Sequence, residues 1–186
     1  MQGSWRANDG RHCRVIFTPS CHSTKRASSN NTHLCRMYYL LLVHNGLRWL
    51  ILPALLWAVF IGWEGRRHER PFHLSDRIAV STVSVLSHIQ LLLGFWMYIE
   101  SPVVKGFWAE RSFQWADPLF FSLIHFGLMV TAIVLITIGS ALVKRKMEDQ
   151  KKFTAILQYY GLALLIILIA IPWPFSPLAH RPWLRF

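Results

Sequence analysis

Four long apolar segments constrain the fold of this chain more than any other feature of its sequence. They cover residues 38–63, 78–99, 118–143 and 153–174, and Arg48 is the single Asp, Glu, Lys or Arg within them. About 20 apolar residues in helical conformation are enough to cross the hydrocarbon core of a bilayer, and a helix satisfies its own backbone hydrogen bonds there. The pattern therefore predicts an all-α fold, a four-helix transmembrane bundle.

The composition agrees with a membrane protein and excludes several other classes. The chain is 53% hydrophobic and 16% charged, whereas charged residues make up about a quarter of an ordinary soluble domain. A soluble single-domain enzyme, a disordered chain, a disulfide scaffold and a collagen-like fibre each need a different composition. We therefore expect a multi-pass protein whose main contact is the lipid bilayer.

The net charge of +11 is explained by where the cationic residues lie. Residues 64–77 and 144–152 together hold nine Lys and Arg, whereas the opposite side of the bundle holds four after residue 37. Cationic loops stay on the cytoplasmic side, so we expect both termini of the four-helix domain outside the cytoplasm. No basic face carries interleaved aromatics outside the apolar segments, which argues against nucleic-acid binding.

Residues 1–36 differ from the rest of the chain. They are rich in Ser, Asn, Arg and His, hold all three cysteines and lack a long apolar run. The composition also suits a mitochondrial transit peptide, but Pro19, the Asn30–Asn31 pair and scattered glycines argue against the amphipathic helix that such a peptide forms. We expect a disordered N-terminal extension and a true start at Met37, because the six extra cations of the extension would cancel the charge asymmetry. The membrane domain is then 37–186.

The candidate site residues are the ionisable side chains within the four segments: His44, Arg48, His88 and His125. Such groups are costly in lipid, so each is a functional hypothesis. A structural zinc usually takes four protein ligands, but haem iron needs one or two axial groups from the protein. Three histidines on three helices therefore predict at most one bis-histidine haem. Interhelical hydrogen bonding is the competing structural interpretation of each histidine.

We expect His88 and His125 to be the axial metal ligands, because consecutive antiparallel helices pack together, with His44 as the substitute. Arg48 lies one turn after His44 on the same face, where it can bind a haem propionate, hold a quinone carbonyl or extend to the headgroups. Gln90 lies on a different face from His88 and is expected to join helices. Small residues on the His125 stripe leave room for a macrocycle or for close helix packing, namely Ala132 and Gly139.

Several strings in the sequence resemble a family of small four-helix bacterial membrane proteins generally labelled cytochrome b. They are HNGLRW at His44–Trp49, HIQLLLG at His88–Gly94, Ser101-Pro102, His125 and IPWP at 171–174. The resemblance covers nearly all of the membrane domain and none of the extension. The histidine of the third helix often follows a Glu in that family, but here it follows Ile124.

This resemblance and the histidine set lead to one functional expectation. The chain would bind haem b and pass electrons between a membrane quinone pool and a respiratory partner protein. A haem-free membrane subunit or assembly factor and a protein that binds quinone or a small solute are the alternatives. A stand-alone enzyme is not expected, because the sequence shows no nucleophile–base–acid set and no Gly-rich phosphate loop.

Overall fold

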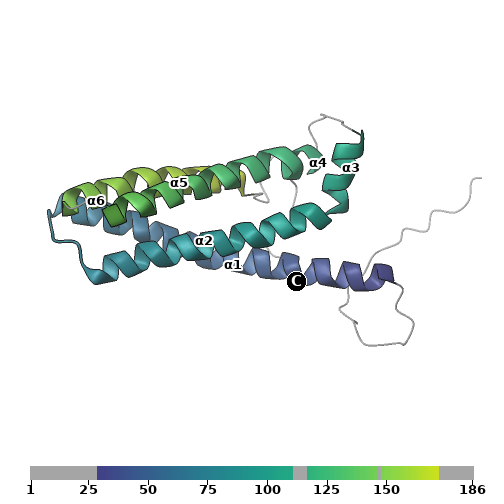
Figure 1. Ribbon diagram of the computed structural model, residues 1–186, viewed down its shortest axis with the longest axis horizontal. Helices are drawn as coiled ribbons and strands as arrows, with labels where there is room; N and C mark the ends of the chain where they lie inside the picture. Colours follow the sequence, from purple (N-terminus) through teal and green to yellow (C-terminus); the bar gives the residue numbers. More distant parts are fainter. Residues whose placement is uncertain (1–28, 111–116, 146–147, 172–186) are drawn as a thin grey trace, which may run out of the picture.

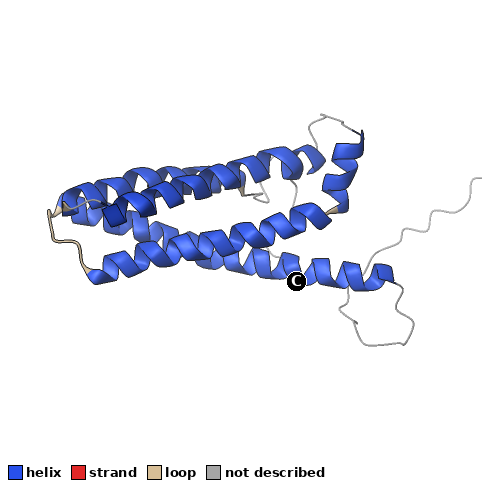
Figure 2. Ribbon diagram, viewed as in Figure 1, coloured by secondary structure: helices blue, strands red, loops and turns tan. Residues whose placement is uncertain are grey.

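The structure is a computed structural model that describes residues 29–110, 117–145 and 148–171, without the side chains of 29–34, 110 and 117. Every regular element within these ranges is a helix (Figure 2). In chain order they are α1 Ser29–Arg67, α2 Leu74–Glu100, α3 Pro102–Glu110, α4 Asp117–Leu119, the π-helix η1 Phe120–Ile124, α5 His125–Arg145, α6 Asp149–Ala155, the π-helix η2 Ile156–Tyr160 and α7 Gly161–Ala170.

Four helical stretches are long and apolar enough to cross a membrane, which confirms this part of the predicted fold. They are Cys35–Arg67, Leu74–Glu100, Phe120–Arg145 and Asp149–Ala170. The long stretches lie side by side as a bundle (Figure 1), in which α1 contacts α2 and the α6–η2 stretch while α5 contacts α2 and α7. Large apolar side chains cover the outer surface, as lipid contact requires; Leu92 and Ile169 are 69% and 68% exposed.

The core is built where glycines let large side chains approach a helix backbone. Gly62 and Gly65 of α1 face Ile156 and Phe153, and a Cβ at Gly65 would overlap the Phe153 ring. Phe153 is fully buried. This close approach packs α1 against the fourth span.

Arg70 joins several elements at the basic end of the bundle. We use this name for the end formed by residues 64–77, 144–145 and 148–152. Arg70 donates to Glu64 Oε2 at 2.6 Å and to both carboxylate oxygens of Asp76 at 2.6 and 3.0 Å. Its guanidinium also lies 4.9 Å from the centre of the Phe153 ring. The hydrogen bonds that Arg70 donates to Asp76, together with the bond that it donates to Glu64, outweigh the effect of burial and raise the pKa of Arg70 above its ordinary value. Arg70 is therefore charged throughout the usual working range of pH.

Helix α1 starts earlier than the predicted membrane domain. It begins at Ser29 and runs without a break into the first span, whereas residues 29–36 were expected to belong to a disordered extension. Arg36 forms an ion pair with Glu100 at the end of α2, with an Nη2–Oε1 distance of 2.6 Å. This ion pair connects the part of α1 that precedes Met37 to the end of α2. The rest of the expected extension, 1–28, lies outside the described residues.

Two π-helical turns interrupt the third and fourth spans. In a π-helix each turn holds more residues than in an α-helix, so the side chains that follow are rotated relative to a continuous α-helix. The turn η2 ends with Tyr160, which is fully buried and donates from its hydroxyl to Val80 O at 3.1 Å. The turn η1 ends directly before His125.

Candidate functional site at the far end of the bundle

His125 lies at the far end of the bundle, opposite the basic end, and its ring is held in one orientation. Its Nδ1 lies 2.8 Å from Ala170 O at the end of α7. A carbonyl oxygen only accepts hydrogen bonds, so Nδ1 carries the proton and, in the neutral ring, Nε2 keeps its lone pair. The rings of Phe120 and Phe121 flank the imidazole, with centroid distances of 5.9 and 6.1 Å. Metal-ligating histidines are oriented in this way by a second hydrogen bond.

His44 approaches from α1 and rests against α2. A Cβ at Gly94 would lie 3.2 Å from His44 Cε1, so only a glycine leaves the ring its full space. The backbone carbonyl of His44 accepts a hydrogen bond of 2.8 Å from Gln90 Nε2. This bond confirms the expectation that Gln90 joins two helices. The imidazole Nδ1 of His44 is buried and has no partner among the described residues.

Arg48 completes the group. The electrostatic interactions among His44, Arg48 and His125 link each of the three to the other two. The Arg48 guanidinium lies 5.3 Å from the centre of the Trp49 ring, and its Nε is buried without a partner among the described residues. We call His44, Arg48, Gln90 and His125 the polar centre. It brings together three of the four predicted site residues.

Unpaired buried polar atoms concentrate around this centre. Among the described residues they are His44 Nδ1, Arg48 Nε, Ser87 Oγ, Gln90 Oε1 and Ser122 Oγ. Ser87 lies halfway along α2, and the others belong to the polar centre or to the start of the third span. A buried polar atom without a partner costs about 1–3 kcal/mol. Such atoms in a folded protein require a partner, such as an ordered water, an ion or a ligand.

His88 lies apart from the polar centre. Its side chain is exposed; Nδ1 donates to Ser84 O at 2.7 Å and Nε2 lies 3.2 Å from Thr137 Oγ1 of α5. Thr137 follows His125 by 12 residues, which is about 18 Å along a helix. The structure thus does not bring together the predicted pair His88 and His125. It joins His88 to α5 through an interhelical hydrogen bond and places the substitute, His44, with His125.

The small-residue stripe of α5 belongs to the packing. A Cβ at Gly139 would lie 2.8 Å from Tyr159 Cβ and 3.0 Å from the Tyr160 ring. Ala132 is fully buried. Of the two interpretations of this stripe, the structure supports close helix packing.

No protein-family model, curated protein or solved structure matches this chain.

The donor set itself limits what the polar centre can bind. The described residues contain no group of three or more His, Cys, Asp or Glu suited to a bare metal ion. Two imidazoles from different spans match the number of protein ligands that haem iron takes, and a guanidinium at the same end of the bundle matches a carboxylate. The residues present therefore fit a haem better than a mononuclear zinc or copper site.

Sequence reasoning missed two contributors to the centre. Gly94 belongs to a family-like string, and a glycine inside a span is a signal for close approach. The carbonyl of Ala170 leaves no signal in the sequence, because any residue supplies one.

Proposed function

We propose that the polar centre binds one b-type haem, with His44 and His125 as axial ligands, and that the chain carries electrons within the membrane. The observation that carries this proposal is that His44 of α1 and His125 of α5 lie at the same end of the bundle, within the range over which their charges interact. A haem, when bound, supplies reversible one-electron chemistry at its iron. The partners would be a membrane quinone pool and a respiratory protein.

The chain's own residues would bind the haem, orient the two histidines and keep water away from the centre. Ala170 O fixes the His125 ring so that Nε2 faces away from the hydrogen-bonded nitrogen. Gly94 supports the His44 ring from behind. Arg48 supplies a charged donor for a propionate carboxylate, and the apolar spans keep water from the centre. None of these roles needs a catalytic acid or base.

We also propose the orientation that the charge pattern favours and the bacterial inner membrane that the family resemblance implies. The basic end holds most of the Lys and Arg of the membrane domain, so it would face the cytoplasm. The N- and C-termini of the membrane domain would then lie on the opposite side of the membrane.

The deciding experiment is a reduced-minus-oxidised absorption spectrum of protein purified from haem-replete cells. The wild type should show the sharp α-band of a b-type haem. His44→Ala and His125→Ala should each remove it, because each leaves the iron with one axial ligand. His88→Ala is the matched control, since it deletes a third intramembrane imidazole that lies elsewhere, and its band should persist.

Two results would contradict the proposal. A wild-type spectrum without the band would favour a haem-free subunit. Loss of the band in His88→Ala, with both other variants unchanged, would move the ligands. Size-exclusion chromatography and circular dichroism would identify a variant that does not fold. In that case His44→Met and His125→Met test the same ligands.

A quinone is the second candidate for the same centre, because the unpaired Nε of Arg48 is a donor suited to a quinone carbonyl. It would be favoured if no haem is found and Arg48→Gln abolishes quinone binding.

A further inference from the structure

We propose that the basic end binds the phosphate headgroup of one anionic phospholipid, with an acyl chain lying along α2. The proposal rests on two adjacent cavities, one between α2 and the neighbouring spans and one along the surface of α2. It is independent of the haem, because the site lies at the opposite end of the bundle from the polar centre.

The first cavity is lined by both cationic and apolar side chains. It measures about 470 Å³. Arg77, Lys144, Lys152 and His73 supply its polar wall, and Phe72, Val80 and Val143 lie among its apolar lining. A headgroup phosphate needs cationic donors at the membrane surface and carries apolar chains below them. The two kinds of wall match these two parts.

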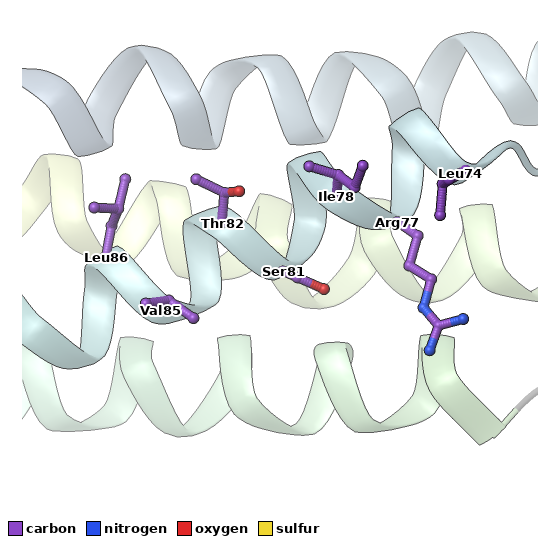
Figure 3. A pocket seen from close by; sticks show the side chains of 7 residues that line it. All are labelled: Leu74, Arg77, Ile78, Ser81, Thr82, Val85 and Leu86. Carbon is purple, nitrogen blue, oxygen red and sulfur yellow. The ribbon is translucent and has the colours of Figure 1, made fainter.

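Arg77 and Lys144 are the cations available to such an anion. Both are exposed, and among the described residues neither forms an ion pair. Figure 3 shows the Arg77 side chain extending from α2 toward the neighbouring span, and the cavity that it lines also contains Lys144 of α5. The net charge that they offer is therefore not neutralised within the described structure.

The carboxylates near the cavity are already paired with other groups. Asp149 accepts from Lys152 Nζ at 2.8 Å and from the backbone N–H of Phe72 at 3.0 Å. Asp76 is held by Arg70 at 2.6 Å. Lys152 is consequently neutralised in part, and we assign the main contacts to Arg77 and Lys144.

The second cavity is a groove that runs from the first cavity along the surface of α2 (Figure 3). It measures about 390 Å³, shares Leu74, Arg77 and Ser81 with the first, and continues past Ile78 and Val85 to Leu86. From Leu74 to Leu86 the helix rises about 18 Å. A largely apolar groove of this length starting at a cationic pocket fits an acyl chain below a phosphate. A free anion would use only the first cavity.

The test is the thermal unfolding of the purified protein in detergent with three probes: dioleoylphosphatidylglycerol, dioleoylphosphatidylcholine and inorganic phosphate. A ligand that binds only the folded state raises the midpoint. We expect phosphatidylglycerol at a hundredfold excess over its Kd to raise it by about 5 °C or more. Phosphatidylcholine and inorganic phosphate should give much smaller shifts.

The pocket variant is Arg77→Gln with Lys144→Gln, and it should lose most of the phosphatidylglycerol shift. The matched control is Arg66→Gln with Arg145→Gln, which removes the same charge from the same end outside the cavity lining, and it should keep the shift. Ser81→Phe fills space shared by both cavities without changing charge. It should also abolish the shift, and it keeps the test valid if the double variant does not fold.

Three outcomes would overturn the proposal. An equal loss in the control variant would mean diffuse electrostatic attraction. An unchanged shift in Ser81→Phe or in the folded pocket variant would mean that the lipid binds elsewhere. An equal shift with inorganic phosphate would mean a simple anion site without a lipid.

Discussion

Gly94 shows how a single residue supports the polar centre, since the His44 ring occupies the space in which a side chain would lie. We predict that Gly94→Leu displaces this ring and sharply lowers haem content, as measured by the ratio of the haem to the protein absorbance. Gly127→Leu on α5 is the control, because a Cβ at Gly127 meets nothing within 4 Å. Equal haem content in both variants would contradict the assigned position of His44.

Arg48 allows a test that leaves the axial ligands in place. A cation near a haem stabilises the electron-rich reduced form, so removing it should lower the midpoint potential. We predict a lower potential for Arg48→Gln in a redox titration. Arg66→Gln at the basic end should leave the potential unchanged, and an unaltered potential in Arg48→Gln would place the arginine away from the cofactor.

At the scale of the elements, the contact of α1 with the fourth span depends on close approach at Gly65. We predict that Gly65→Ala lowers the free energy of unfolding by about 1–3 kcal/mol, because the new Cβ overpacks against the buried Phe153 ring. Gly46→Ala in the same helix meets open space. It should raise the free energy of unfolding by about 0.5–1 kcal/mol through helix propensity. Both can be measured by denaturation in mixed detergent micelles, and equal effects would argue against the packing at Gly65.

Hydropathy predicted the elements but could not predict which histidines meet. The apolar runs identify four spans because crossing lipid requires a long and apolar segment, and both properties can be read from the sequence. The predicted pair His88 and His125 depends on α2 and the third span being neighbours. They are neighbours, but His88 contacts α5 at Thr137 and not at His125. Which histidines meet depends on the depth of each residue in the membrane and on its rotation around the helix axis. Each π-helical turn changes this rotation for all residues after it. No periodicity of 100° per residue anticipates such a turn.

At the scale of the whole molecule, Arg70 connects the end of α1, the following loop, the start of α2 and the Phe153 ring of the fourth span. We predict that Arg70→Met costs about 1.5–3 kcal/mol of unfolding free energy, because the buried Asp76 loses its charged hydrogen bonds. Lys151→Met is the control. Its pair with Glu148 has side chains 59% and 65% exposed, and such pairs contribute about 0–1 kcal/mol. Similar losses in the two variants would show that Arg70 does not join the elements.

The wide turn η1 has a consequence for comparing proteins of this kind. Because the wide turn holds about one residue more than an α-helical turn, His125 lies roughly 100° away from where an uninterrupted α-helix through the same residues would place it. A sequence of the same length and nearly the same hydropathy that formed an ordinary α-helix here would turn His125 away from the carbonyl of Ala170. Two chains with indistinguishable membrane profiles can thus differ in whether they possess the centre at all.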